Sequence, residues 1–226
     1  LYTLIKPKLV EHGIKLGRDG FFTYLRSEGL LVKPKKSFTK TTFSKHWMKK
    51  HPNLLKEEGL HNAEHVLVSD ITYLESDQGV HYLSLVTDSG SRKIVGHHLS
   101  SDMKAENVVK ALKMAVKDNR YKGNAVHHSD RGLQYCSAIY QKELTAYGIH
   151  PSMTDGYDCY QNALAERING ILKQEFLLYR CKTIEELKIL VTESINIYNE
   201  MRPHLALDME TPNAVHNRKG QLRELA

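Results

Sequence analysis

Three short apolar runs between residues 66 and 100 constrain the fold more than any other feature of the sequence. The runs VLVSDITYL, VHYLSLVTD and KIVGHHLS are rich in Val, Ile, Leu and Tyr, and the short segments ESDQG and SGSR separate them. β-Branched and aromatic residues bounded by Gly, Ser and Asp are typical of strands joined as hairpins. Residues 66–100 are therefore predicted to form an antiparallel meander.

The residues after this meander alternate between helical and extended patterns. Amphipathic spacing predicts helices over 102–119, with Asp102 as the cap, and over 137–148, 160–179 and about 183–200. Short apolar segments predict strands over 124–130 and 149–153. The order β-β-β-α-β-α-β-α-α predicts an α/β fold, a mixed five-stranded sheet flanked by helices.

A pair of helices is predicted at the N-terminal end. Apolar residues have helical spacing within 3–12, and Phe21, Phe22 and Leu25 share one face of a second helix that Gly29 ends. A helix, a short turn and a helix outline a helix-turn-helix, although any helical hairpin has the same pattern. No Met precedes Leu1, so we expect the chain to begin inside a longer protein.

Positive charge is concentrated in the first 60 residues. They hold 13 Lys and Arg against 5 Asp and Glu, whereas the remaining residues hold 19 against 21. Residues 29–56 contain eight lysines and no acidic residue, with Phe38, Phe43 and Trp47 interleaved. Cations among aromatic side chains suit a phosphate backbone, and a disordered basic linker has the same composition. The lysines that we expect to bind DNA here are Lys33, Lys35, Lys36, Lys40 and Lys45.

These patterns divide the chain into four predicted regions. They are a helix-turn-helix-like region over 1–32, a basic linker or arm over 33–60, a core over 61–200 and a C-terminal tail over 201–226. No run of about 18 apolar residues occurs, so no membrane span is predicted. Three widely spaced cysteines indicate neither a disulfide framework nor a zinc finger, which favours a reducing cytoplasm.

Two aspartates lie in or at the end of predicted strands. Asp70 stands in the middle of VLVSDITYL, where a charge is costly unless it is paired or bound to a cation. Asp130 ends the segment NAVHHSD. The ordinary explanations are a hydrogen-bonded buried carboxyl for Asp70 and a turn or helix cap for Asp130. Before Asp130, His127 and His128 are possible metal ligands, but adjacent residues of a strand point to opposite faces. We expect one to be buried beside the sheet and the other to lie near the edge of the site, both mainly as scaffold.

A third carboxylate lies on the helix predicted for NALAERINGILKQEF. Glu166 shares one face of that helix with Asn162, Gly170 and Lys173. Such a face is often only solvated surface. However, Gly170 costs roughly 1 kcal/mol inside a helix, and the close approach of another molecule would explain it.

Together, Asp70, Asp130 and Glu166 suggest metal chemistry. Mg²⁺ prefers oxygen ligands and is commonly held by one or two carboxylates with water and substrate phosphates. Two such ions about 4 Å apart stabilise the attacking and leaving oxygens of an in-line phosphoryl displacement. This chemistry needs no nucleophilic motif such as G-x-S-x-G, and the sequence has none.

These motifs resemble those of the DDE transposase and retroviral integrase superfamily. The match lies in VSDITYL, HHSDRGLQYCS and NALAERINGILKQEF, with 35 residues between Asp130 and Glu166 and with Lys173 seven residues after the Glu. The segments LVTDSGSRKIVGHHLS and YNEMRPHLALDMETP are similar to the IS-three family of bacterial insertion sequences, in particular its catalytic reading-frame B product. The resemblance covers about residues 15–215.

The resemblance implies an RNase H-like fold for residues 61–200 and a metal-binding triad of Asp70, Asp130 and Glu166. It implies two Mg²⁺ ions in the presence of DNA, with Mn²⁺ as a substitute, and the cleavage and joining of double-stranded DNA by a dimer or larger assembly. Lys173 is expected near the reacting end, Asn162 at a phosphate, and Arg131 at a phosphate or beside Asp130. We expect the protein in the bacterial cytoplasm, at the nucleoid.

Two positions depart from the family pattern. Leu67 stands where the family usually has Trp, and Gln161 stands where it usually has an acidic residue. Neither belongs to the triad, so packing and DNA contacts are affected more than chemistry. Two other functions stay open, an RNase H-fold nuclease that does not join strands and a catalytically inert DNA-binding protein.

Overall fold

The computed structural model describes residues 1–31, 46–55, 66–117, 121, 123, 125–155 and 162–224, with side chains as far as residue 218. The chain divides into two compact units, Leu1–Ser37 and Phe38–Ala226. The predicted lysines Lys33, Lys35, Lys36, Lys40 and Lys45 lie outside the described residues, as does Gln161. The four predicted region boundaries stay a prediction.

The first unit contains the two predicted helices, α1 (Tyr2–Glu11) and α2 (Arg18–Ser27). They pack through the rings of Tyr2 and Phe21, whose centroids are 5.7 Å apart. Gly29, with φ of 68°, ends α2 as predicted. The Leu30 amide donates a hydrogen bond to the Leu25 carbonyl, and the Gly29 amide donates to the Arg26 carbonyl. Together these two bonds form a Schellman motif.

The second unit is built on the predicted mixed sheet of five strands. They are β1 (Val66–Ser76), β2 (Gly79–Asp88), β3 (Ile94–Ser100), β4 (Val126–Ser129) and β5 (His150–Met153), in the order β3-β2-β1-β4-β5. The meander β1-β2-β3 is antiparallel, whereas β4 pairs in parallel with β1 and with β5. β1 is therefore the central strand.

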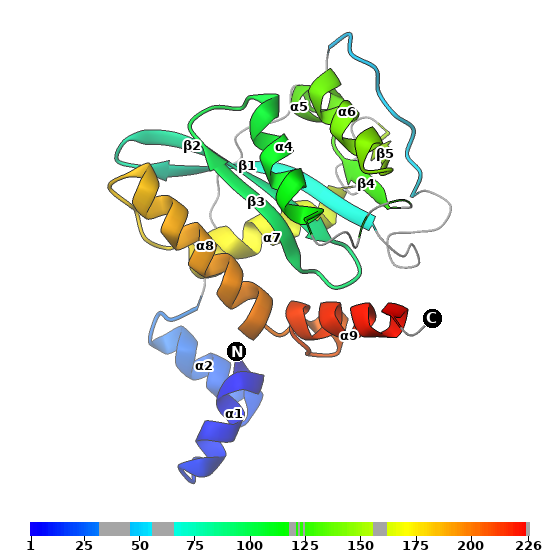
Figure 1. Ribbon diagram of the computed structural model, residues 1–226. Coiled ribbons are helices and arrows are strands. Elements are labelled where there is room, and N and C mark those ends of the chain that lie inside the picture. The colour runs from blue at the N-terminus through cyan, green and yellow to red at the C-terminus, as the bar shows by residue number, and fades with distance from the viewer. Residues whose placement is uncertain are drawn as a thin grey trace. The chain divides into compact units, whose positions relative to one another are not determined.

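Helices cover both faces of this sheet (Figure 1). On one face, α4 (Ala105–Ala115) and α6 (Ala138–Ala146) pack on a core that includes Leu67 and Ile71. On the other, α7 (Ala163–Ile171) and α8 (Ile184–Met201) pack on a core that includes Leu74 and Leu83. Because side chains alternate along β1, residues 66, 68 and 70 share the face of Leu74 and α7.

The remaining elements are short or lie near the C-terminal end. They are the single turn α5 (Leu133–Cys136), the π-helix η2 (Leu172–Phe176), the 3₁₀ turn η3 (Leu205–Leu207) and α9 (Pro212–Glu224). The helix predicted over 160–179 is thus α7 followed directly by a π-turn. α9 was not predicted, because PNAVHNRKGQLRE lacks a stripe of apolar residues.

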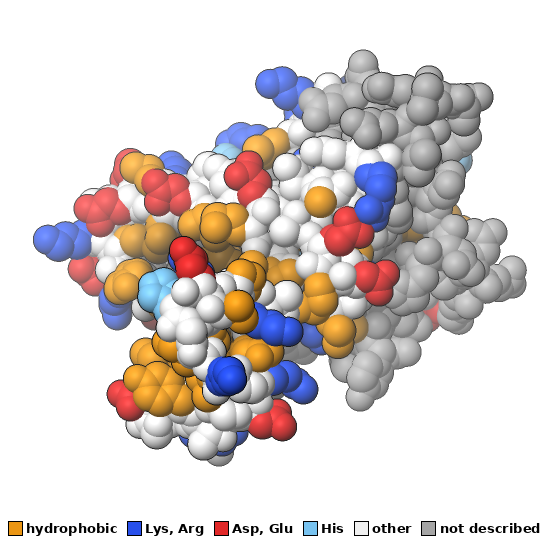
Figure 2. Space-filling model, turned by 90° about the horizontal axis from the view of Figure 1, so that it is seen from below, with side chains coloured by type: hydrophobic (Ala, Val, Ile, Leu, Met, Phe, Trp, Pro, Cys, Tyr) orange, Lys and Arg blue, Asp and Glu red, His pale blue; other side chains and the backbone are white. Residues whose placement is uncertain are grey.

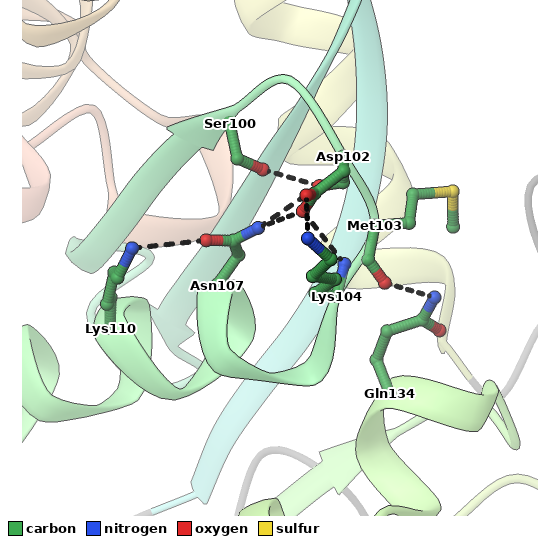
Figure 3. Close-up of polar contacts among 7 residues, drawn as sticks. All are labelled: Ser100, Asp102, Met103, Lys104, Asn107, Lys110 and Gln134. Atoms are coloured by element: carbon green, nitrogen blue, oxygen red, sulfur yellow. Dashed lines mark hydrogen bonds and ion pairs between the residues drawn. The ribbon is translucent and has the colours of Figure 1, made fainter.

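The prediction that Asp102 caps the next helix is wrong, because Lys104 is the N-cap of α4 and makes no side-chain capping bond. The Asp102 carboxylate instead accepts hydrogen bonds from the Lys104 amide at 3.3 Å and from Asn107 Nδ2 at 2.6 Å (Figure 3). The Asp102 carbonyl also accepts from Ser100 Oγ at 2.7 Å. Asp102 therefore braces the β3–α4 junction from two residues before the cap.

The surface seen in Figure 2 is mixed in charge. Basic, acidic and apolar side chains are interspersed there, and no single sign of charge dominates this face. No helix among the described residues is long and apolar enough to cross a membrane.

Candidate active site

The register of β1 and β4 brings Asp70 and Asp130 to the same level of the sheet. Val68 pairs with His128 in the parallel ladder. Asp70 lies two residues beyond Val68, and Asp130 lies two residues beyond His128 and one beyond the end of β4. Neighbouring strands are about 4.8 Å apart. Sequence positions 60 residues apart therefore meet at the carboxyl end of two parallel strands, where open α/β sheets commonly form their sites.

Asp70 accepts two hydrogen bonds, but burial and neighbouring acidic groups disfavour its negative charge. The Ile71 amide donates to Oδ1 at 2.9 Å, and Asn169 Nδ2 donates to Oδ2 at 2.7 Å. Burial, and then the charge of Asp130, raise the pKa of the Asp70 carboxyl to about 8, with a smaller contribution from Glu166. In the absence of a cation, this carboxyl therefore holds a proton near neutral pH.

Asp130 begins a tight turn that fixes its carboxylate. The Gly132 amide donates to Asp130 Oδ1 at 2.9 Å, and Ser129 Oγ donates to the Asp130 carbonyl at 3.0 Å. Such a turn is the ordinary structural role that the sequence left open for this residue. The structure shows that role and, in addition, the closeness of the carboxylate to Asp70 and Glu166, which affects the pKa of both.

Glu166 reaches the same place from the opposite layer. It is an exposed residue of α7, three residues before Asn169, so the two share one side of the helix. Ala165 is small and packs against Val66 and Val68, which lets α7 lie close to β1. Burial and the charge of Asp130 raise the pKa of the Glu166 carboxyl. The charge of Asp130 thus acts on both of the other carboxyls, and the charge of Glu166 also acts on Asp70.

The donor set fits a divalent cation in its chemistry, because three carboxylates supply the hard oxygen ligands of Mg²⁺. Within the described part of the chain, however, no three His, Cys, Asp or Glu side chains are grouped tightly enough to enclose a metal ion. Three like charges repel one another, and the Gly132 amide and Asn169 each hold one carboxylate in place. Metal binding here requires these side chains to converge.

Lys173 lies in η2, seven residues after Glu166. Its ammonium nitrogen is 4.1 Å from the centroid of the Tyr73 ring on β1, a cation–π contact. The same π-helix contains Glu175, whose carboxylate accepts two hydrogen bonds of 2.7 Å each from the Arg202 guanidinium. A DNA contact by Lys173 stays a prediction.

Asn162 and Arg131, the other two described residues predicted to contact DNA, have partners within the protein. Asn162 is buried, and its Nδ2 donates to the Ser69 carbonyl on β1 at 3.3 Å. Arg131 lies 3.7 Å from Asp155, and its carbonyl oxygen is 2.8 Å from His46 Nε2. A contact of Arg131 or of Asn162 with phosphate stays a prediction.

The histidines before Asp130 are scaffold. His127 is buried, and its Nε2 lies 2.7 Å from Ser69 Oγ and 2.8 Å from the Tyr140 hydroxyl. Burial lowers the pKa of His127 to about 3, so the ring is neutral. His128 is buried too, and its Nδ1 lies 2.9 Å from Ser152 Oγ on β5. Burial raises the pKa of the nearby Cys136 thiol, which makes it a poor nucleophile.

Two residues near the carboxylates were missed from the sequence. Asn169 donates to Asp70, and its spacing of three from Glu166 on a helix was the available signal. Tyr135 is buried, and the charges of Asp70 and Asp130 contribute to raising its pKa. In the sequence, Tyr135 resembles any aromatic residue that packs into a core, so no pattern marks it as a neighbour of the site.

Comparison with known proteins places this chain in a family. Two profiles, both described as integrase core domain, match residues 61–159 and 147–212. The insertion element IS600 uncharacterized 31 kDa protein of Shigella sonnei is 34% identical over 221 residues, which cover 96% of this chain and 81% of that protein. The transposase InsF for insertion sequence IS3A of Escherichia coli strain K12 is 36% identical over 152 residues.

The chain belongs to the IS-three family of insertion-sequence transposases. The match to InsF covers 67% of this chain and 53% of InsF, so the chain matches only about half the length of that transposase. The predicted family is therefore confirmed, within the DDE transposase and retroviral integrase superfamily.

A solved structure confirms the RNase H-like fold. The HTLV-2 integrase catalytic core domain in complex with magnesium superimposes with a TM-score of 0.54, over 67% of this chain and 95% of that chain. The two sequences are 18% identical, so this likeness concerns the fold. This chain and that integrase core thus share one fold.

Proposed function

We propose that the chain is a DDE transposase that cleaves the 3′ ends of its element and joins them to other DNA. The observation that carries this proposal is the meeting of three acidic side chains from β1, the end of β4 and α7. The parallel register aligns Asp70 with Asp130, and the bond from Asn169 to Asp70 ties α7, with Glu166, to the same point. Family membership supports the same activity.

Asp70, Asp130 and Glu166 are the proposed ligands of two Mg²⁺ ions, with Mn²⁺ as a substitute. Bound there, the ions would supply positive charge for the attacking and leaving oxygens of a phosphodiester. The magnesium complex of the HTLV-2 integrase core supports this choice of metal. The raised pKa of Asp70 supports it as well, because a carboxyl with two acidic neighbours is best ionised beside a cation.

The proposed reaction has two steps. Water attacks a phosphodiester at the end of the element and releases a 3′-hydroxyl. That hydroxyl then attacks a second phosphodiester, forms a new P–O bond and displaces the 3′ oxygen of the target strand. Each step exchanges one P–O bond for another, so neither needs a protein nucleophile.

The proposed partner is double-stranded DNA, both the element ends and the target. Lys173, Asn162, Arg131 and the lysines between residues 33 and 45 are the proposed contacts to phosphate, which position DNA without reading its sequence. Because two ends must be paired, we propose a dimer or larger assembly on DNA. We place the reaction in the bacterial cytoplasm, at the nucleoid.

A strand-transfer assay tests this function. The substrate is a labelled duplex that carries the terminal inverted repeat found beside the gene, incubated with target plasmid and Mg²⁺. We expect a shortened strand with a free 3′-hydroxyl, followed by labelled plasmid. Nicked DNA without joined product would identify a nuclease instead. No cleavage with either Mg²⁺ or Mn²⁺, together with retained DNA binding, would identify an inert DNA-binding protein.

A further inference from the structure

The segment 46–55 is anchored to the edge of the sheet beside the candidate active site. The Met153 amide on β5 donates to the Pro52 carbonyl at 3.3 Å, and the Leu54 amide donates to Ser152 Oγ at 3.0 Å. At the other end of the segment, Met48 packs against the core beneath α4 and α6. Figure 1 shows the segment running along the side of the unit that carries α6 and β5.

The first residues of this segment are joined to the loop of Asp130. His46 Nε2 lies 2.8 Å from the Arg131 carbonyl oxygen, across 85 positions of sequence. Lys50 Nζ donates to the His46 carbonyl at 3.0 Å and so closes the turn that contains Trp47. Trp47 and Asp130 are each one residue away from the contact between His46 and Arg131. The indole is thereby held near the candidate active site.

Trp47 is 91% exposed, although its two neighbours, His46 and Met48, each contact the rest of the unit. It has the largest exposed fraction among the large apolar residues of the described chain, and it is the single Trp of the sequence. Met48, the next residue, packs inward. An indole exposed in this way gains no stabilisation from burial of its apolar surface within the fold. This indicates an external partner with a flat, apolar face.

The charges around the indole select the kind of partner. Lys49 and Lys50 follow it, and the segment 46–55 contains no Asp or Glu. Arg131, the neighbour of Asp130, is linked to the same turn. A flat aromatic surface among cations suits a nucleobase with its flanking phosphates. A base inside a duplex has both faces covered by its neighbours, so the exposed indole fits a base that has left the stack.

We propose that Trp47 is a stacking site for an unpaired base of the DNA strand that reacts at Asp70, Asp130 and Glu166, an inference that rests on the proposed function. Lys49, Lys50 and Arg131 hold the adjacent phosphates. Trp47 thereby stabilises a locally opened DNA end beside the scissile phosphodiester. It is a positioning residue, because it holds the substrate next to the reacting atoms and takes no part in bond exchange.

The single Trp gives a direct test that needs no catalysis. The full chain carrying Asp130→Asn is titrated with single-stranded oligothymidylate and with a duplex of equal length, and the tryptophan fluorescence is recorded. Stacking predicts strong quenching by the single strand, loss of access of acrylamide to the indole, and much weaker effects with the duplex. Unchanged fluorescence while a labelled oligonucleotide binds, or no binding of the oligonucleotide at all, overturns the proposal.

Substitutions at the same position separate stacking from charge. Trp47→Ala is expected to weaken binding of the single strand about tenfold and binding of the duplex less than about twofold. Trp47→Phe keeps a ring and is expected to bind within about threefold of the wild type. Because the side chain is exposed, neither variant should change the unfolding temperature. Equal affinities of Trp47→Ala and the wild type for the single strand contradict stacking.

This outcome is independent of the proposed chemistry. Quenching by the single strand without any cleavage by the wild-type chain would refute the transposase activity and leave the stacking site standing. Cleavage and joining without quenching would support the transposase activity and refute the stacking site.

Discussion

At the scale of single residues, burial and neighbouring charge strongly disfavour the ionised form of the Asp70 carboxyl. Its pKa of about 8 arises from burial and from the charge of Asp130, and the hydrogen bonds from Ile71 and Asn169 only partly offset these effects. Because the folded state favours the protonated carboxyl, the folded state is less stable relative to the unfolded state once that proton has dissociated. The same raised pKa makes the side chain responsive to a divalent cation, which stabilises its charged form.

The stability of the metal-free protein should therefore depend on pH through Asp70. Its folded pKa of about 8 lies above the ordinary value of 3.8, so its contribution to stability is present below about pH 4 and is lost as the pH rises toward 8. The slope for one such group is at most about 1.4 kcal/mol per pH unit. Urea unfolding in EDTA at pH 5 to 8 should show a shallower decline for Asp70→Asn than for the wild type. Parallel declines would contradict the assigned pKa.

The turn at Asp130 offers a second test. A Cβ on Gly132 would lie 3.0 Å from Asp130 Oδ1 and 3.3 Å from Gln134 Oε1. Gly132→Ala should push the carboxylate away by a few tenths of an ångström and slow DNA cleavage about tenfold, because small misplacements of reacting groups are costly. The free energy of unfolding should change by less than about 1 kcal/mol. A variant with wild-type cleavage would show that this turn does not position Asp130.

At the scale of elements, the site depends on how closely helices approach strands. The sequence predicted each strand and most helices, because period-2 and helical patterns reflect burial directly. It did not predict the π-turn after Ile171, in which Glu175 pairs with Arg202, 27 residues further along the chain. It also missed the bond from Asn169 to Asp70, since a polar residue on a helix shows no partner until the helix is docked.

Two glycines in comparable helix–strand layers should respond in opposite ways. A Cβ on Gly96 of β3 would lie 2.1 Å from the Ala111 carbonyl oxygen and 2.9 Å from the Ala115 amide of α4, whereas a Cβ on Gly170 of α7 meets nothing within 4 Å. Gly96→Ala should therefore destabilise the protein by about 3 kcal/mol. Gly170→Ala should stabilise it by up to about 1 kcal/mol. Urea unfolding of the two variants checks both values.

The same Gly170→Ala variant tests whether DNA lies against this side of α7. If DNA approaches the helix closely between Glu166 and Lys173, the added methyl should lower DNA affinity although it raises stability. Unchanged affinity, measured by fluorescence anisotropy, would show that Gly170 is not needed for a close approach.

At the scale of the whole molecule, the sheet and α7 bring toward one another three acids that are far apart in sequence. The motifs and their resemblance to a known family were sufficient to predict the fold and to nominate Asp70, Asp130 and Glu166, although only Asp70 stands out by itself, as an acid within an apolar strand. Their mutual geometry was not predictable from the sequence. It depends on the register of β1 against β4 and on the small Ala165, which lets α7 approach β1.

The most direct test of the central claim is whether the three carboxylates act as one unit in DNA cleavage. The measurement is the Mg²⁺-dependent cleavage rate of a labelled element end by Asp130→Asn, Glu166→Gln, the double variant, and Glu193→Gln as an exposed control on α8. We predict a loss of at least about a thousandfold, about 4 kcal/mol, for each single site variant. We predict no further loss in the double variant and no loss in the control. Retained cleavage in either single site variant, or losses that multiply in the double variant, would contradict a shared metal site.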